Sequence, residues 1–382
     1  MMSFQLRAAP TRVRRALQWA LGLLSASLIL GAAVASAAAR PFIKGFSAST
    51  IATTQPPNLD QNPYGIVRVP ATVGSLHRGD LLVSNFNNAA NTQGTGTTIV
   101  EIPRRGNSQT PGSARVFAQI DQSKLPTPCP GGVGLTTALA VTRRGFVIVG
   151  SLPTTDSQLD TAGAGCLLVL DRNGNVVKTI SGGPINGPWD MTAVDHGSSV
   201  TLYVTNVQNG NVATSATPVD RGTAVRLDLK TEPRHPVRVL DEDVIATGFP
   251  ELASTTAVVL GPTGVALSKH GILYVADTQG NRIGAIPDAN DRERPIGGGG
   301  ITVTSNHLLN GPLGMTLAPN GDILTANGGD GLVVETTPDG HQVASVDTGF
   351  GAGSLFGLTA SPHGHKVYLV DDGNNTLAVL QR

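Results

Sequence analysis

The chain carries little charge, and its charges cancel. Charged residues make up 14% of its 382 positions, and 27 Lys and Arg balance 27 Asp and Glu. In globular chains about 25% of the residues are charged, so this share is low. The sequence therefore lacks the basic footprint that nucleic acid or anionic lipid would require. Low charge and 40% hydrophobic residues also exclude a disordered chain and allow a substantial core.

Signatures of several enzyme classes are missing as well. The chain has no Gly-x-Ser-x-Gly elbow, no Walker loop and no dinucleotide fingerprint in its proper context. The glycine run at 297–300 precedes neither a Lys-Ser/Thr pair nor a helix, so it predicts a flexible loop rather than a phosphate cradle. Cysteine is scarce too, and only Cys129 and Cys166 are present. In an exported protein the two can pair, and two separate buried thiols are the alternative.

The first 39 residues read as a secretory signal peptide. A basic start precedes the apolar run 16–34, and Ala35-Ser36-Ala37 is a small-x-small cleavage pattern. An uncleaved anchor is the alternative, because the run approaches the length of a membrane span. No later stretch is long and apolar enough to span a bilayer. We therefore expect a periplasmic or secreted protein in which residues 40–382 form one domain.

Glycine and proline are abundant, with 47 and 25 residues, as in folds of many short strands and tight turns. The segment 261–288, GPTGVALSKHGILYVADTQGNRIGAIPD, contains three short apolar strands, each closed by turn residues. The unit occurs six times along the chain in imperfect copies, and this segment is the fourth. The last copy is one strand short, and the segment 45–53 is one strand without a unit. We therefore predict an all-β, six-bladed β-propeller whose ring is closed by an N-terminal strand. A seven-bladed ring and two stacked sheet domains are the alternatives.

These units resemble the NHL-repeat family of β-propellers and, more loosely, the gluconolactonase-like propellers. The likeness is carried by Pro262-x-Gly264-Val265, by the strand 271–277 and by Asn281-Arg282-Ile283. It implies a scaffold more than a function, because such propellers host lyases, lactonases, hydrolases and binding modules.

Long irregular segments fall on one face of the expected propeller, where each unit begins and where its second strand ends. They are 85–97, 121–134, 151–165, 206–222 and 241–261. Long loops at one end of a rigid scaffold commonly bind partners. Cys129 and Cys166 lie on this face of the same blade, which favours a disulfide between them.

The middle residue of each P-x-G motif opens an innermost strand and should lie near the channel, as expected for Tyr64, Trp189 and Phe356. In gluconolactonase-like propellers, acidic and amide side chains near these positions hold a divalent metal. Here only Asp190, standing where the repeat has Gly, offers a carboxylate. One Asp is a weak metal site, so this departure argues against that chemistry. A bond from Asp190 to the backbone is the equal alternative.

Polar residues close the second strands, and they suit either a ring of hard-cation ligands or turn hydrogen bonds. The structural interpretation is favoured for Asn85, Asn206, Asp277, Asn327 and Asp371. In the loop that follows the first of these, Asn87 and its neighbouring amides suit a glycan or a peptide, and a solvated polar loop is the favoured alternative. The histidines 196, 270 and 363 precede Gly in turns of separate blades, which makes a shared zinc site improbable.

We expect a binding or scaffolding module that takes a small molecule, glycan or protein on its long-loop face, without a cofactor. The ligand-binding residues would be Tyr64, Asn85, Asn87, Trp189, Asp190, Asn206 and Phe356. The alternative is a metal-dependent hydrolase or lyase of lactonase type in the central channel, holding Ca²⁺ or another divalent cation. No nucleic acid and no stable membrane span are expected.

Overall fold

The computed structural model describes residues 40–103, 114–210, 212–361 and 364–382. The predicted signal peptide and His363 lie outside the described residues. From Arg40 onward the chain folds as one compact unit of antiparallel sheets. Its helical elements in the described ranges are three short 3₁₀ turns, η1 (Gln122–Lys124), η2 (Leu159–Thr161) and η3 (Val212–Thr214). A search of the described residues finds no helix with the length and apolarity needed to cross a membrane.

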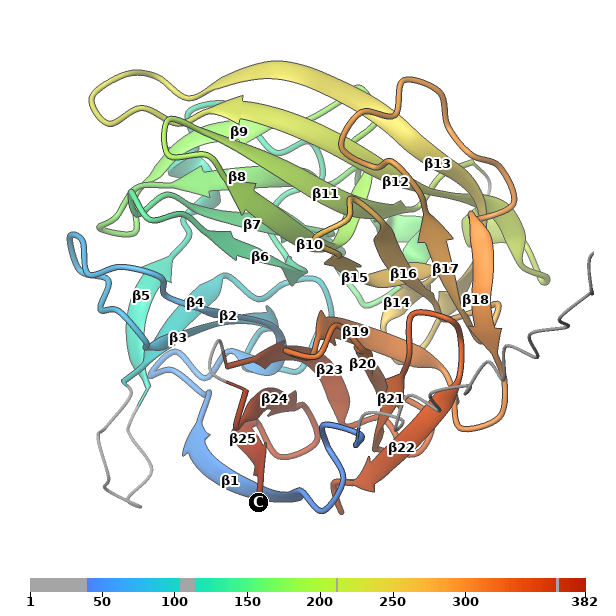
Figure 1. Ribbon diagram of the computed structural model, residues 1–382. Helices are drawn as coiled ribbons and strands as arrows, with labels where there is room; N and C mark the ends of the chain where they lie inside the picture. The colour runs from blue at the N-terminus through green and yellow to red at the C-terminus, as the bar shows by residue number, and fades with distance from the viewer. Residues whose placement is uncertain (1–39, 104–113, 211, 362–363) are drawn as a thin grey trace, which may run out of the picture. The chain divides into compact units, whose positions relative to one another are not determined.

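Six sheets make up the fold, and five of them are built from consecutive strands (Figure 1). The first sheet contains β2 (Gln61–Arg68), β3 (Leu81–Asn87), β4 (Thr98–Ile102) and β5 (Arg115–Gln119). The second contains β6 (Leu135–Val141), β7 (Val147–Ser151), β8 (Cys166–Leu170) and β9 (Val176–Ile180). The third contains β10 (Gly187–Asp195), β11 (Ser199–Val207), β12 (Val219–Lys230), β13 (Arg238–Ser254) and β14 (Val258–Leu260).

The other three sheets have four strands each. The fourth contains β15 (Pro262–Leu267), β16 (Leu273–Asp277), β17 (Arg282–Ile286) and β18 (Ile301–Ser305). The fifth contains β19 (Pro312–Leu317), β20 (Ile323–Asn327), β21 (Leu332–Thr336) and β22 (Gln342–Asp347). The sixth contains β23 (Leu355–Ala360), β24 (Val367–Asp371), β25 (Thr376–Gln381) and β1 (Ser47–Thr53). In this last sheet β1 pairs antiparallel with β25, from Ser47 opposite Gln381 to Thr53 opposite Thr376.

The first strands of successive sheets pack side by side around a central axis. Contacts run from β2 to β6, β10, β15, β19 and β23 and back to β2, so the six sheets form a β-propeller. The predicted fold class, all-β with six blades, is therefore confirmed.

Burial explains the strand sequences. Four of the six second strands, β16 (LYVAD) among them, are buried at every position because a sheet covers each of their faces. Such strands read as near-continuous apolar runs. The outermost strands, such as β22, mix buried and exposed positions because their edge meets solvent.

One long loop expected from the sequence is a strand. The segment 241–261 was expected to be irregular, but β13 continues to Ser254 and then turns back into β14. The physical reason is pairing with β12, which extends beyond the body of the sheet as far as Val219 opposite Glu251. The third sheet therefore has five strands, and its β12–β13 pair is longer than the strand pairs of the other sheets.

Candidate active site

Each innermost strand is bulged at its P-x-G motif. The pairing register shifts there in all six sheets, as between Pro262 and Val265 of β15. A bulge brings the third residue of the motif close to the next blade. A Cβ built on Gly264 would lie 2.2 Å from the Leu313 carbonyl oxygen, and one on Gly314 would lie 2.0 Å from that of Phe356. These positions therefore favour glycine. Ala138 and Asp190 replace it in the second and third sheets, and Asp190 alone brings an ionisable side chain.

Asp190 turns its carboxyl group into the channel between the blades. Its Oδ1 accepts a hydrogen bond from the Met191 N–H at 2.7 Å, and its Oδ2 accepts one from the Val265 N–H of the next blade at 3.4 Å. The residue is 8% exposed. Burial raises the pKa of Asp190 to about 8, against the opposing effect of these two N–H groups. The carboxyl group is therefore mainly protonated at neutral pH.

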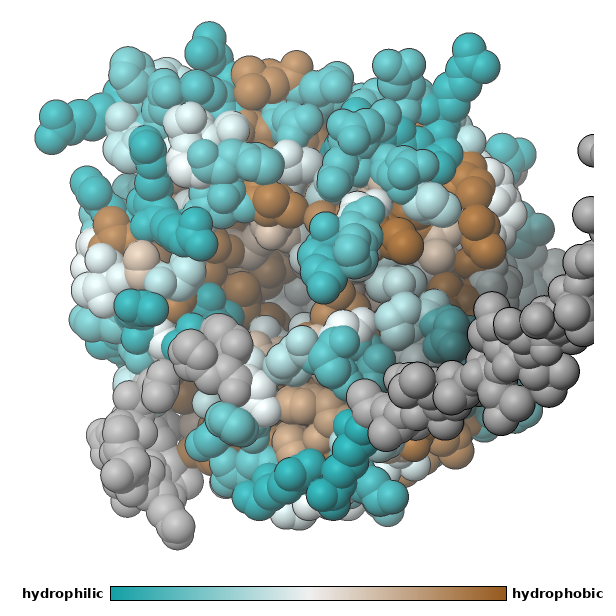
Figure 2. Space-filling model, in the orientation of Figure 1, coloured by the Kyte–Doolittle hydropathy of each residue, from teal (hydrophilic) through white to brown (hydrophobic). Residues whose placement is uncertain are grey.

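A cavity of about 320 Å³ surrounds this carboxyl group. Its wall is built from the second halves of the six innermost strands, and it contains hydrocarbon side chains, threonines and backbone. Asp190 is the one ionisable side chain among the lining residues. Figure 2 shows a hollow near the middle of the ring, with apolar side chains at its edge. The size falls within the range of small-molecule sites, which is about 300–1,000 Å³.

The other end of the channel is filled by aromatic rings. Tyr64 stacks on Phe356 with 3.9 Å between ring centroids, on Phe86 with 4.6 Å, and on Trp189 with 5.7 Å. Tyr64, Trp189 and Phe356 are 1%, 2% and 4% exposed. They lie at the channel, as the repeat predicts, but in the interior rather than at an opening. Their burial follows because aromatic rings at the crowded axis pack on one another.

Long loops cover this aromatic stack. The Trp189 Nε1–H donates to the Val259 carbonyl in β14 at 2.8 Å. Leu152, Leu159 and Val212 from the neighbouring loops belong to the same apolar cluster as the rings. Hydrogen bonds also join the loops to one another, as from Gln93 N–H to Ser157 Oγ at 2.8 Å. The long-loop face thus forms a cap over the channel, and the cavity opens at the end with short turns.

The polar residues at the second-strand ends hold turns. Asn85 Nδ2 donates to the Thr54 carbonyl at 3.2 Å, and Asn206 Oδ1 accepts from the Asn186 N–H at 3.1 Å. Both side chains are fully buried beside the segments that lead into their sheets. The same role falls to Asn327, whose Nδ2 donates to the Leu308 carbonyl at 2.7 Å. These contacts agree with the structural interpretation and do not converge on a common point.

Asn87 is also directed inward. It is 1% exposed, and its Nδ2 donates to Asn91 Oδ1 at 2.7 Å within its own loop. The neighbouring Asn62 amide, oriented to donate to Asp372, accepts a bond from Asn87 Nδ2. Burial, and secondarily the charge of Asp371, raises the pKa of Asp372 to about 8. Two of the loop amides predicted to meet a ligand, those of Asn87 and Asn91, are thus engaged with each other.

The side chains that line the channel cavity do not supply the donors that a divalent metal requires. Calcium takes six to eight oxygen ligands, and several are carboxylates in most sites. Asp190 is the single carboxylate of the lining, accompanied by threonines such as Thr192 and Thr316. The shortage of carboxylates that the sequence shows at the strand entries is therefore also found among the residues that line the cavity. His196 and His270 are exposed on turns of different blades, and neither joins a metal-capable group among the described residues.

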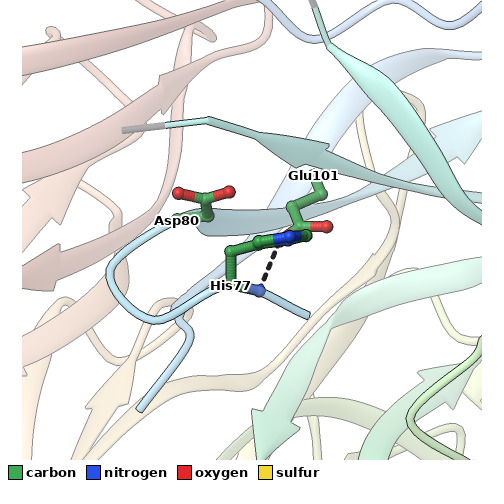
Figure 3. A group of neighbouring side chains, drawn as sticks. All are labelled: His77, Asp80 and Glu101. Carbon is green, nitrogen blue, oxygen red and sulfur yellow. Dashed lines mark hydrogen bonds and ion pairs between the residues drawn. The ribbon is translucent and has the colours of Figure 1, made fainter. Parts of the chain in front are cut away.

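One metal-capable group in the described ranges was missed by sequence reasoning. His77, Asp80 and Glu101 approach one another at the short-turn end of the first sheet (Figure 3). The Arg115 guanidinium already fills the site, because its Nη2 lies 2.9 Å from Glu101 Oε2, 2.6 Å from His77 Nδ1 and 3.4 Å from Asp80 Oδ2. Burial raises the pKa of Glu101, and Arg115 and the His77 N–H oppose that effect. The group is a structural ion-pair network.

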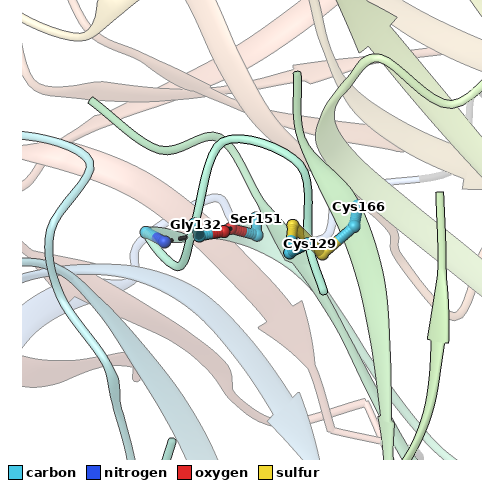
Figure 4. The surroundings of a disulfide bond; sticks show 5 residues. Cys129, Gly132, Ser151 and Cys166 are labelled. Atoms are coloured by element: carbon cyan, nitrogen blue, oxygen red, sulfur yellow. Dashed lines mark hydrogen bonds between the residues drawn. A yellow bond between two sulfur atoms is a disulfide. The ribbon is translucent and has the colours of Figure 1, made fainter. Parts of the chain in front are cut away.

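A disulfide bond fastens part of the cap. Cys129 and Cys166 are joined, with 5.6 Å between their Cα atoms (Figure 4). Ser151 lies beside the bond, accepting from the Gly134 N–H at 2.9 Å and donating to the Gly132 carbonyl at 3.1 Å. The bond ties the loop that leads into the second sheet to the start of β8.

The known proteins that this chain resembles are similar to it in fold. No family model matches the sequence, and no curated protein matches it. A gluconolactonase from Xanthomonas campestris is similar over 88% of this chain and 89% of its own, with 14% identity and a TM-score of 0.52. What the likeness shows is the fold.

Two further solved structures are also similar to this chain in fold, at low sequence identity. An aldose sugar dehydrogenase from Streptomyces coelicolor, in its PQQ-bound form, matches 90% of this chain and 99% of its own, with 16% identity and a TM-score of 0.53. A luciferin-regenerating enzyme matches 88% and 96%, with 12% identity and a TM-score of 0.51. At these identities the propeller is shared, while the site residues have to be argued from this chain alone.

Proposed function

We propose that the protein is a hydrolase or lyase acting on a small uncharged molecule in the central channel, with Asp190 as its proton-transferring group. The observation that carries the proposal is a buried carboxyl group facing a cavity of about 320 Å³. General acid–base catalysis works best when the pKa of the group lies near the operating pH, and that of Asp190 is raised to about 8. The solved gluconolactonase of similar fold adds support for an ester-type substrate.

For a lactone, one carboxyl group supplies both proton transfers. The protonated oxygen of Asp190 donates to the ring oxygen that leaves, while the other oxygen accepts the proton of the attacking water. The carbon–oxygen bond of the ring breaks, a carbon–oxygen bond to water forms, and Asp190 ends in its starting state. The wall of hydrocarbon and threonine favours an uncharged substrate, because it offers no charged partner to an ionic one.

The scaffold interpretation is not the one we propose, because the long loops pack on the aromatic stack and on each other. We also propose that the repeats are of NHL type, that residues 1–39 are removed as a signal peptide, and that the protein is periplasmic or secreted. The disulfide supports export, since such bonds persist in oxidising compartments. The donor set at Asp190 supports a reaction without a divalent cation there.

The test is hydrolysis of a panel of uncharged sugar and aliphatic lactones, followed by proton release. We expect at least one lactone to be opened by the wild-type protein and Asp190→Asn to lower kcat/KM about 100-fold or more. Asp160→Asn, an exposed carboxyl group on the long-loop side, is the matched control and should leave the rate unchanged. Equal rates for the wild type and Asp190→Asn would refute the role of Asp190.

A further inference from the structure

A second cavity, of about 300 Å³, lies between turns of the second and third sheets. Its floor is apolar, with Phe146 and Val237 buried at 8% and 5% exposure. Its rim is cationic and exposed, and it carries Arg144, Arg172, Arg234 and His235. The residues come from turns at the short-turn end of the propeller, and none of them lines the central channel.

The three arginines of the rim form no direct ion pair across the described ranges. The two acidic neighbours are already engaged. Glu232 pairs with Lys230 at 3.0 Å, and Asp171 accepts from the N–H groups of its own turn, that of Asn173 at 2.8 Å and that of Asn175 at 3.0 Å. Asp171 lines the same cavity, and Glu232 also acts electrostatically on Arg144 and His235, so these two carboxylates offset part of the charge of the three arginines. The rim keeps a net positive charge for a ligand.

This concentration of cations is not a consequence of overall composition. Four of the chain's 27 basic residues, Arg7, Arg12, Arg14 and Arg15, lie in the first 39 positions, where no acidic residue occurs. Residues 40–382 therefore hold 23 basic and 27 acidic residues and are net negative. A cluster of unpaired arginines on such a domain costs stability through mutual repulsion unless something neutralises it.

Backbone contacts fix the rim. The Arg172 carbonyl accepts from both the N–H and the Oγ of Ser75, each at 3.0 Å. The Arg172 stem lies where a side chain on Gly145 would be, 2.7 Å from a Cβ built there. Arg234 has a φ of 70°, a left-handed conformation that bulky residues seldom adopt. Such conformations persist where the surroundings enforce them, and they concentrate at binding sites.

We propose that this cavity binds a small organic oxyanion. A carboxylate or phosphate group would lie among the guanidinium groups of Arg144, Arg172 and Arg234, which match planar oxyanions with paired N–H donors. The apolar body of the same molecule would pack on Phe146 and Val237. A bare inorganic ion would leave that floor uncovered, so the ligand carries both parts. This site is separate from the one in the channel and does not depend on it.

Calorimetric titration at low salt with phenyl phosphate, benzoate and inorganic phosphate tests the proposal. We expect saturable binding of phenyl phosphate or benzoate, tighter than that of inorganic phosphate and weakened by added salt. The tighter of the two organic ligands identifies the headgroup. Arg172→Gln and Arg234→Gln should each raise the Kd about tenfold, while Arg294→Gln, an exposed arginine on the fourth sheet's loop, should not change it.

Three results would overturn the proposal. They are no saturable binding of either organic ligand, equal affinity for inorganic and organic phosphate, and an unchanged Kd in both rim variants. Thermal melting of each variant separates loss of the site from loss of the fold. Arg144→Gln gives a further variant. Arg144 lies in a different turn from Arg172, whose backbone carbonyl bonds Ser75. Lactone hydrolysis should be unaffected in all of these variants, so this site and the channel can fail separately.

Discussion

Tyr64 and Phe356 stack with 3.9 Å between their ring centroids and 15° between their planes. The first ring belongs to β2 of the first sheet and the second to β23 of the sixth, so their contact crosses the boundary between the two ends of the repeat array. Both rings are almost completely buried. The aromatic residues that suggest ligand binding in the sequence thus hold the ring of blades together.

Truncating this stack should destabilise the whole propeller. Phe356→Ala removes a ring that contacts both Tyr64 and Trp189, and we expect a loss of about 3–5 kcal/mol in the free energy of unfolding. Urea denaturation measures it. Ile301→Ala, at a position 55% exposed, is the control and should stay within about 0.5 kcal/mol of the wild type. A Phe356→Ala loss as small as that of the control would contradict the packing role.

The pKa of Asp190 predicts a pH dependence of stability. Because burial raises it from 3.8 to about 8, the folded protein holds a proton that the unfolded chain releases above pH 4. The stability that this bound proton gives the folded protein therefore falls as the pH rises from about 4 to about 8, and it levels off above pH 8. We expect Asp190→Asn to gain about 2–3 kcal/mol relative to wild type between pH 6 and pH 9.

Denaturation at the two pH values measures that difference. Other buried acids, such as Asp372 and Glu251 with pKa raised to about 8 and about 7, titrate in both proteins and cancel in the comparison. A difference that stays constant with pH would show that the Asp190 carboxyl group is not protonated in the folded protein.

The disulfide should stabilise the cap and the second sheet. Replacing Cys129 and Cys166 with Ala frees a loop closed over a sequence separation of 37 residues, and we expect a loss of about 2–4 kcal/mol. Melting with and without reductant is the measurement. The wild type should lose stability in reductant, and the double variant should not respond. Insensitivity of both proteins would indicate that the bond contributes nothing to the folded state.

Glu335 should anchor the segment that precedes β1. Its Oε1 accepts from the Phe42 N–H at 2.7 Å and its Oε2 from the Ile43 N–H at 2.9 Å, and the side chain is fully buried. We expect Glu335→Ala to speed amide exchange across residues 40–46 and to cost about 1–3 kcal/mol. Exchange monitored by mass spectrometry tests it. The exposed Glu293→Gln is the control, and equal exchange in the two variants would count against the anchor.

Chelation should leave the protein intact. Asp190 is the one carboxylate among the residues that line the channel cavity, and Arg115 fills the group around Glu101. We therefore expect an unchanged melting temperature in excess chelator, and lactone hydrolysis that continues there. A lower melting temperature restored by added Ca²⁺ would show that a cation site exists elsewhere in the chain.

Much of the architecture was readable because each sheet repeats one local pattern. The strand over 272–275 was predicted from its apolar run and turn residues and appears as β16. The prediction was wrong for the segment 241–261, because the pairing of β13 with β12 is decided by contact across strands rather than by local composition. Asp190 stood out as the residue in place of glycine, but the arginine rim did not, since its members come from three separate turns.

The sequence alone determined the number of blades and singled out Asp190 at the channel, because periodicity is a local property and a residue that departs from the repeat is visible without the fold. Only the tertiary structure decided which end of the channel is open. Side chains from distant blades compete for the crowded axis, so the rings of Tyr64, Trp189 and Phe356 fill one end and leave Asp190 facing the cavity at the other. That outcome depends on packing among all six sheets, which no single repeat encodes.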